Sequence, residues 1–400
     1  MENLAVSRTE TVVIGAGPAG LAAAACLTRA GVPLVILERE QRLGASWHRH
    51  YERLHLHTDK NRSELPFLRY PGDYPRYPSR AQVIEYLESH ARQFGVRPRF
   101  GQRVVSARRV EGSWQTRTAD ALYVSKTLVI ATGYNGELYV PTWPGQESFA
   151  GEIVHSSAYG NGDPYRGKAV LVVGFGNSGG EIAIDLWEHG ARATLAVRSP
   201  VNILPRDLLG IPILAIAIPL NRLPPRLADI LTVPILRLVF GNLSGLGLRR
   251  SRYGPFAQIR RKARIPLIDV GTVGLIRRGH VQVRPGIERF TRDGVVFAGG
   301  QETRFDAVVM ATGYRPALSF LDEASAVTDA HGNPFASGRE VLPGLYFCGF
   351  HVSPTGMLRE IAMEAKRIAR EIARSYTGAP GVPPEVARAP RASGPEPRSP

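Results

Sequence analysis

A strand, a glycine-rich loop, a helix and a second strand follow one another near the start of the chain, and the same order returns in its middle. The first copy has a β-branched strand at Thr11–Ile14, the loop Gly15–Gly20, an alanine-rich helix to about Ala30 and a strand at Leu34–Leu37. A lone glycine loop is a weak signal, whereas the complete unit is the context that dinucleotide-binding folds require. The first copy therefore predicts a nucleotide site.

The second copy begins with a strand at Ala169–Val173, which leads into the loop Gly174–Gly179. A helix to about His189 and a strand at Thr194–Val197 complete it. Because strands and helices alternate in both copies, we expect an α/β fold with two Rossmann-like dinucleotide-binding domains.

The glycines of each loop have separate tasks. The first permits a tight turn, the second lets the backbone approach a pyrophosphate, and the third allows the helix to pack closely on the strand. The positive N-terminus of the helix then faces the phosphates. We therefore predict cofactor contacts from Gly15, Gly17, Pro18, Ala19 and Gly20 in the first loop and from Gly174, Gly176, Asn177, Ser178 and Gly179 in the second.

The residues that end the second strand of each unit differ in charge. Glu38 follows the first strand, where a carboxylate accepts hydrogen bonds from a ribose diol and repels a 2′-phosphate. Arg198 follows the other, where a guanidinium can bind a 2′-phosphate through two hydrogen bonds. The sequence thus predicts FAD at the first unit and NADPH at the second, with their neighbours Arg39 and Ser199 as further contacts.

Two later predicted strands end in the same tripeptide, Ala-Thr-Gly. Thr127–Gly133 reads TLVIATG and Ala307–Gly313 reads AVVMATG, and a tyrosine follows each. We infer that the NADPH domain is inserted into a discontinuous FAD domain, with cofactor contacts from Thr132, Gly133, Thr312, Gly313 and Tyr314. The FAD domain is expected to comprise two segments, 1–150 and 301–377, on either side of an NADPH domain at 151–300 with a lid-like insert at about 205–250; a disordered tail is expected at 378–400.

Composition narrows the class of protein. The chain is 44% hydrophobic and has a net charge of +15, but its basic residues are scattered and form no nucleic-acid module, so we expect no nucleic-acid partner. Its two cysteines are far apart, which argues against a disulfide framework and a redox pair. No signal peptide precedes the first strand, so a cytoplasmic location is expected.

The histidines between His48 and His57 alternate, but no cysteine or carboxylate cluster joins them, and we predict no metal site.

One apolar segment bears on membrane contact. Leu208–Asn221 has no charged residue, and Ile230–Phe240 has one, Arg237. A spanning helix needs roughly 20 apolar residues, and prolines interrupt this segment. We therefore expect a pair of short buried or lid-like helices, with contact at a membrane surface as the less favoured alternative.

The pattern Phe149-x-Gly151-x-x-x-His155-x-x-x-Tyr159 resembles the fingerprint of class B flavin-containing monooxygenases. Related Baeyer–Villiger enzymes usually carry Trp where this chain has Tyr159. The resemblance covers about residues 10–375 and is closest to the YUCCA-type flavin monooxygenases. It rests further on the stretches GASW at 44–47, YPRYP at 74–78, LPR at 204–206, DVGT at 269–272 and PGIERFT at 285–291.

The resemblance implies an NADPH-dependent flavin monooxygenase that converts indole-3-pyruvate, or a similar aryl 2-oxo acid, to the acetate through a flavin C4a-(hydro)peroxide formed with O2. Since the chain lacks a cysteine pair, O2 is the main remaining electron acceptor. S- or N-oxygenation of hydrophobic amines or sulfides stays open as an alternative, as does a non-catalytic NADPH- or redox-sensing flavoprotein. A 2-oxo acid needs a cation or amide donors for its carboxylate, and Arg206 and Arg249 are candidates.

Further site residues follow from the resemblance. Trp47 is expected near the flavin, and Lys60 and Asn61 are the catalytic candidates, since class B enzymes place an asparagine near the flavin and nicotinamide. Gly349 and Phe350 are expected to complete the FAD site at its flavin end.

Overall fold

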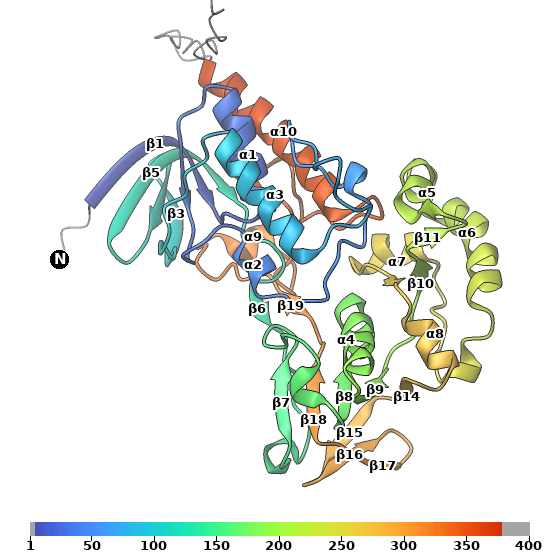
Figure 1. The fold of residues 1–400 in the computed structure, drawn as a ribbon. Coiled ribbons are helices and arrows are strands. Elements are labelled where there is room, and N and C mark those ends of the chain that lie inside the picture. The colour runs from blue at the N-terminus through green and yellow to red at the C-terminus, as the bar shows by residue number, and fades with distance from the viewer. Residues whose placement is uncertain (1–4, 378–400) are drawn as a thin grey trace, which may run out of the picture.

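The computed structural model describes residues 5–377, which form one mixed and one parallel sheet with helices packed on them and a helical lobe beside them (Figure 1). This arrangement confirms the predicted α/β class. The expected disordered tail at 378–400 lies outside the described residues.

The first sheet is built on the first glycine-loop unit. Its strand order is β2-β1-β5-β21-β20, with β1, β2, β5 and β21 parallel, and the β3–β4 hairpin extends it from β5. The last four residues of β1, Thr11–Ile14, are buried because the sheet is covered on both faces there, which explains the continuous run TVVI. The strands are β1 (Ala5–Ile14), β2 (Leu34–Leu37), β3 (Ser106–Val110), β4 (Ser113–Arg117), β5 (Ala121–Ile130), β20 (Glu340–Leu342) and β21 (Leu345–Phe347).

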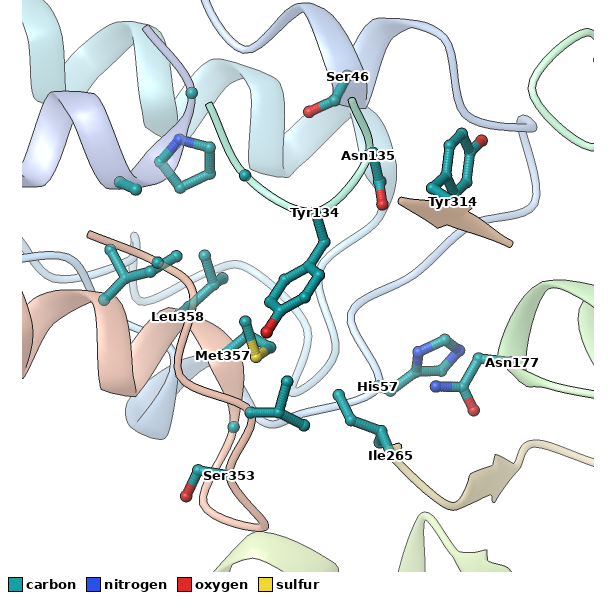
Figure 2. Close-up of a pocket in the computed structure, with 18 of the residues that line it drawn as sticks. Ser46, His57, Tyr134, Asn135, Asn177, Ile265, Tyr314, Ser353, Met357 and Leu358 are labelled. Atoms are coloured by element: carbon teal, nitrogen blue, oxygen red, sulfur yellow. The ribbon is translucent and has the colours of Figure 1, made fainter. Parts of the chain in front are cut away.

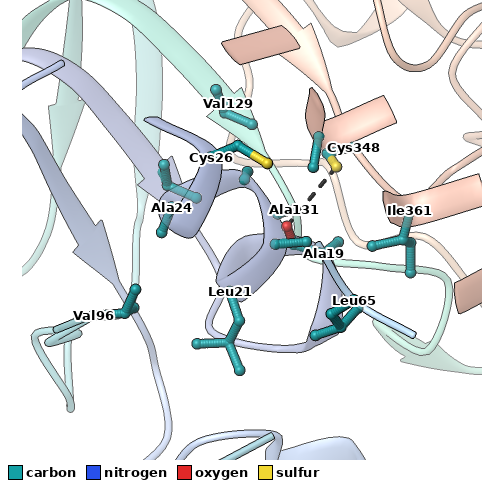
Figure 3. Close-up of a cluster of buried hydrophobic side chains, with 14 of the residues drawn as sticks. Ala19, Leu21, Ala24, Cys26, Leu65, Val96, Val129, Ala131, Cys348 and Ile361 are labelled. Atoms are coloured by element: carbon teal, nitrogen blue, oxygen red, sulfur yellow. Dashed lines mark hydrogen bonds between the residues drawn. The ribbon is translucent and has the colours of Figure 1, made fainter. Parts of the chain in front are cut away.

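Three helices pack together on this sheet: α1 (Pro18–Arg29), α3 (Arg80–Gln93) and α10 (Met357–Thr377). The alanines of α1 are buried, so their small side chains let α10 approach closely. Figure 3 shows the core between them, which includes Cys26 and Cys348. Both are free thiols, and burial raises the pKa of Cys26 to about 12, so neither is suited to redox chemistry.

The second sheet is entirely parallel, with the order β14-β9-β8-β18-β7. Its strands are β7 (Glu152–His155), β8 (Ala169–Val173), β9 (Arg192–Ala196), β14 (Gln282–Arg284) and β18 (Ala307–Met310). Two helices, α4 (Asn177–Glu188) and α8 (Thr272–Arg277), accompany it, and an antiparallel sheet of β15 (Ile287–Phe290), β16 (Gly294–Phe297) and β17 (Glu302–Arg304) adjoins it.

The chain returns to the first unit later than the expected boundary at residue 301. β18 pairs with both β8 and β7, and β17 pairs with β16, so the stretch 302–310 belongs with the second sheet. The reason is that the AVVM strand is as apolar as its counterpart in the first sheet, and apolar character alone does not tell a strand which sheet to join.

The apolar insert leaves the second unit at β10 (Ile203–Pro205) and returns at β13 (Leu267–Asp269), which pairs with β10. It is thus longer than the expected 205–250. Between these strands lie β11 (Asp207–Leu208), β12 (Ile211–Pro212), α5 (Ile213–Leu220), α6 (Pro225–Phe240), η4 (Ser244–Leu246) and α7 (Pro255–Lys262). Its helices form the lobe at the edge of the molecule opposite β1 (Figure 1).

Short elements complete the connections. β6 (Glu137–Leu138) pairs with β19 (Tyr314–Arg315), which joins the segments that follow the two Ala-Thr-Gly sequences. The others are α2 (Ala45–His48), η1 (Lys60–Arg62), η2 (Gln146–Ser148), η3 (Asp163–Tyr165) and α9 (Ala324–Val327).

Candidate active site

A cavity of about 1240 Å³ is enclosed by residues of the first unit, the second unit and the insert. Figure 2 shows side chains from several of these segments facing it, among them Tyr134, Met357, His57 and Ile265. Small-molecule clefts commonly measure about 300–1,000 Å³. The cavity therefore has room for more than one small ligand.

The first glycine loop borders this cavity and is shaped by close backbone contacts. Gly15 has φ +103°, and a Cβ there would come 2.6 Å from the carbonyl oxygen of Ala131. A Cβ on Gly20 would lie 1.8 Å from the carbonyl oxygen of Gly15. A Cβ on Gly17 would meet no atom within 4 Å. Packing thus explains the outer two glycines, while the open side of Gly17 lies at the cavity and suits close approach of a phosphate group.

The second loop repeats this geometry. Gly174 has φ +107°, and a Cβ there would come 2.6 Å from the oxygen of Ala311; on Gly179 it would lie 2.1 Å from the oxygen of Gly174. A Cβ on Gly176 again meets no atom within 4 Å. Of this loop, Asn177 lines the cavity, and its Oδ1 accepts a hydrogen bond of 2.8 Å from the amide of Ile268 in the insert. In both loops the outer two glycines are required by packing, while the middle glycine is open to a ligand. This is the geometry that the pyrophosphate of a dinucleotide needs.

Glu38 lies where a ribose-binding carboxylate is expected. Its Oε2 accepts a hydrogen bond of 2.7 Å from the amide of Ala16, and its Oε1 accepts one of 3.0 Å from the amide of Glu40. The side chain is buried yet lines the cavity, as does Arg39. Two backbone amides thus hold the carboxylate in place for a ligand hydroxyl.

Arg198 and Ser199 lie away from this cavity, at the end of the second sheet. Arg198 is exposed, and its carbonyl oxygen accepts a hydrogen bond of 2.6 Å from Nη2 of Arg249. The side chain of Arg198 passes close to Gly286, where a Cβ would come within 3.2 Å of it. Its guanidinium is therefore available at the surface, where the adenosine end of a bound dinucleotide would lie.

The remaining predicted cofactor contacts divide into two groups. Trp47, Thr132, Gly133, Gly313, Tyr314 and Gly349, together with Pro18 and Ala19, line the cavity. Ser178, Thr312 and Phe350 do not: the Thr312 hydroxyl donates to the carbonyl of Tyr139, and Phe350 packs in the core behind the first sheet. The hydroxyl of Thr132 is buried and has no hydrogen-bond partner among residues 5–377, so a ligand at this wall would satisfy it.

Lys60 and Asn61, the two catalytic candidates, are placed outside the cavity lining. The Lys60 ammonium donates hydrogen bonds of 2.9 Å to the carbonyl oxygens of Pro71 and Gly72 and a further bond to that of Tyr74. Asn61 is exposed. These contacts make Lys60 a support for the 71–74 loop.

An ion cluster that the sequence did not reveal joins the first unit to α4. Glu181 is buried in α4 and bonds to Nε2 of His57, which lines the cavity beside Asn177 (Figure 2). Arg53 lies 3.6 Å from Glu181 and binds Glu188 at 2.8 Å. The residues that pair in this cluster are more than a hundred positions apart in the chain, so sequence spacing alone could not have revealed it.

The fingerprint residues make contacts within the second unit and do not line the cavity. Nε2 of His155 donates to the carbonyl oxygen of Gly313 at 3.1 Å, and burial lowers the pKa of this histidine, which favours the neutral form. The hydroxyl of Tyr159 donates to Oδ2 of Asp185 in α4 at 2.6 Å. His155 therefore fixes the loop after β18, and Tyr159 fixes α4.

The insert supplies an apolar wall with one charged side chain. Leu214, Ile216, Leu220, Ile235, Phe256, Ile259 and Ile265 are among its lining residues, and within the described segment 203–269 Arg264 is the only charged one that lines the cavity. Arg206 instead stacks 4.2 Å from the ring centre of Tyr77, and Arg249 bonds to the backbone of Arg198. Neither of the two expected carboxylate cations lines the cavity, because flanking an apolar segment in sequence does not place a side chain on its inner face.

Residues 12–205 match the family described as pyridine nucleotide-disulphide oxidoreductase. The chain is 41% identical over 370 residues to indole-3-pyruvate monooxygenase YUCCA1 of Oryza sativa subsp. japonica, with 90% of each chain covered. It is 40% identical over 382 residues to indole-3-pyruvate monooxygenase YUCCA6 of Arabidopsis thaliana, covering 92% of this chain and 91% of the relative.

The solved structure of a flavin-containing monooxygenase from Stenotrophomonas maltophilia has a TM-score of 0.71 and 26% identity to this chain, covering 93% of this chain and 99% of the other. The length and identity of these matches agree with the resemblance expected from the motifs. The chain belongs to the YUCCA family of flavin monooxygenases.

Proposed function

We propose that this enzyme binds FAD at the first glycine loop and NADPH at the second, and uses O2 to convert indole-3-pyruvate, or a similar aryl 2-oxo acid, to the arylacetate. One 2-oxo acid, O2, NADPH and a proton give one arylacetate, CO2, water and NADP⁺. One oxygen atom enters the new carboxylate and the other leaves as water. The names of the relatives support the substrate class.

Several residues fit the task of holding FAD. Glu38 would accept hydrogen bonds from the ribose, and the open backbone at Gly17 would receive the pyrophosphate. The buried hydroxyl of Thr132 would form a hydrogen bond with the cofactor. When bound and reduced by NADPH, FAD supplies the electrons that activate O2. The chain's own task is to orient the reactants and to keep water away from them.

The apolar wall of the insert is suited to an aromatic ring. Leu214, Ile216 and Phe256 would cover the ring of the substrate and exclude water from the cavity. Arg264 would bind the carboxylate of the 2-oxo acid by charge-assisted hydrogen bonds. A cation on an otherwise apolar wall is the observation that favours an acidic aryl substrate over a neutral amine or sulfide.

The test is Arg264→Gln, with Lys262→Gln as the matched control because Lys262 is exposed and does not line the cavity. We expect KM for indole-3-pyruvate to rise about tenfold in Arg264→Gln, the loss of one charge-assisted hydrogen bond at an exposed site, and to stay unchanged in the control. Indole-3-acetate formation is measured by chromatography, with NADPH oxidation followed in parallel.

Two outcomes would overturn the proposal. Normal NADPH oxidation without any indole-3-acetate, but with oxygenation of a neutral sulfide, would favour S- or N-oxygenation. NADPH oxidation without an oxygenated product from either substrate would favour a redox-sensing flavoprotein.

A further inference from the structure

Helix α6 is apolar on two opposite faces. Ala228, Leu236 and Phe240 are buried on its inner side. On its outer side Ile230 and Leu238 are 65% and 87% exposed. A surface helix of a globular protein normally carries polar residues on its solvent side. The outer face of α6 therefore has an apolar character that the fold itself does not use.

The outer residues recur at helical spacing and form a continuous stripe. We call this the α6 stripe: Leu227, Ile230, Leu231, Pro234 and Leu238. Leu223, just before the helix, is exposed as well. The helix lies at the outer edge of the insert, away from both sheets (Figure 1), so nothing within residues 5–377 covers the stripe.

Basic residues are concentrated in the segment that carries this stripe, contrary to the expectation that they are scattered. The segment 209–266 contains ten arginines and lysines and a single acidic residue, Asp229, so it carries most of the net charge of +15. Asp229 is buried and accepts hydrogen bonds from the amides of Phe256 and Ala257, so it does not offset the surface charge. The segment that carries the α6 stripe is therefore strongly cationic.

The basic groups lie at both ends of α6. Arg222 and Arg226 are exposed at its start. At its end Arg250 donates to the carbonyl oxygen of Gly241 at 2.6 Å, and burial together with nearby Arg237 lowers the pKa of Arg250. An apolar stripe with arginines near both of its ends suits contact with a membrane surface, where apolar side chains reach the acyl boundary and basic ones meet anionic headgroups.

We propose that the α6 stripe docks the enzyme on an anionic lipid bilayer, with the leucines and isoleucines at the acyl boundary and the arginines on the headgroup phosphates. No helix within residues 5–377 has the length and hydropathy to cross a bilayer, so the contact is at its surface. A two-fold contact with a second copy would bring two equally basic segments together, which like-charge repulsion opposes. A nucleic acid would satisfy the arginines but leave the stripe in water.

Docking would also orient the site. Thr232, Ile235 and Leu236 of α6 line the cavity, while the stripe lies on the outer side of the same helix. A docked enzyme would therefore have lipid and cavity on opposite sides of one helix. This inference concerns the surface of the insert and does not depend on which substrate the cavity takes.

The test is co-sedimentation of the full-length, flavin-loaded enzyme with vesicles of phosphatidylcholine containing 30 mol% phosphatidylserine, compared with pure phosphatidylcholine vesicles. We expect binding to the anionic vesicles at low salt that weakens at high salt. Ile230→Ser/Leu238→Ser should lower partition at least about tenfold. The matched control is Val6→Ser/Phe335→Ser, because both residues are also exposed, at 60% and 68%, but lie outside the insert; it should bind as the wild type does.

A charge pair tests the arginines separately. Arg222→Glu/Arg226→Glu should lower partition onto anionic vesicles at least about tenfold, whereas Arg97→Glu/Arg108→Glu, with the same change in net charge at other exposed positions, should change it less than about twofold. Flavin content and NADPH oxidation in buffer verify that each variant is folded.

Three outcomes would overturn the inference. The wild type could remain in the supernatant with anionic vesicles at low salt, or the control variants could lose as much binding as the α6 variants. Alternatively, sedimentation equilibrium could show a dimer that Ile230→Ser/Leu238→Ser dissociates, which would assign the stripe to a second copy of the chain.

Discussion

Replacing Gly17 by alanine tests whether this glycine is required for folding or for binding of the cofactor. Gly17 has φ −78° and ψ −173°, which alanine adopts without strain. The added methyl group would meet no protein atom within 4 Å. Gly17 is the N-cap of α1, and alanine is a poorer cap, so the apoprotein should lose only about 1 kcal/mol of unfolding free energy.

The effect on FAD should be larger, because the methyl group projects where the pyrophosphate would approach. Hydrogen bonds from backbone amides to a phosphate are worth about 1.5–3 kcal/mol each. If the displaced phosphate loses one or two of them, the binding free energy falls by about 3 kcal/mol, or roughly 150-fold in Kd. Gly176→Ala has the same geometry in the second loop and should weaken NADPH binding while FAD stays bound.

The assay measures the flavin content of each purified variant, the Kd of FAD by titration of the apoprotein, and KM for NADPH. The two variants control for each other, because each should affect one cofactor. The reasoning would be refuted if Gly17→Ala kept FAD affinity within about threefold of the wild type, or if each variant weakened both cofactors equally.

Three further predictions follow from single contacts. Arg198→Ala should raise KM for NADPH by the equivalent of about 1.5–3 kcal/mol and leave NADH little affected; an equal change for both would mean that Arg198 does not bind the 2′-phosphate. Lys60→Met should lower the Tm because the 71–74 loop loses its anchor, with kcat within about twofold of the wild type; a lost kcat at unchanged Tm would instead support Lys60 as a catalytic residue. Gly20→Ala places a Cβ 1.8 Å from the oxygen of Gly15, so soluble protein should be scarce, and a normal yield and Tm would contradict this.

The features of the site that sequence could predict are those set by local backbone geometry. Gly15, Gly17 and Gly20 occupy the positions that a tight turn, an open approach and a close packing contact require, and the positive φ of Gly15 and the contact of Gly20 with Gly15 both arise within the loop. The carboxylate of Glu38 is likewise held by amides of its own unit. Such local requirements leave a readable pattern in one sequence.

The features that sequence could not predict depend on contacts between distant segments. His57 reaches Glu181 across 124 positions, and Arg264 comes to the rim of the cavity just after the turn that ends α7, where Ala263 has φ +45°. Lys60 has the charge that a site residue needs, but three carbonyl oxygens of a nearby loop bind it. Residue type alone therefore indicates several candidate site residues, and only tertiary packing shows which of them reach the cavity.

The C-terminal wall of the cavity carries a pH-dependent group. Glu364 is buried in α10, its Oε2 accepts a hydrogen bond of 2.6 Å from the amide of Gly349 at the cavity, and burial raises its pKa to about 7.

Because a free glutamate has a pKa of about 4.3, the folded protein binds this proton more tightly than the unfolded chain does. The contribution of Glu364 to stability is therefore complete below about pH 4 and is lost as the pH rises to about 7, a change of about 4 kcal/mol. Glu364→Gln cannot titrate, so the difference between its Tm and that of the wild type should shift in favour of the variant as the pH rises from 4.5 to 8. For the exposed control Glu288→Gln this difference should stay constant. A Tm difference between Glu364→Gln and wild type that stays constant with pH would show that this carboxyl group is not protonated near neutrality.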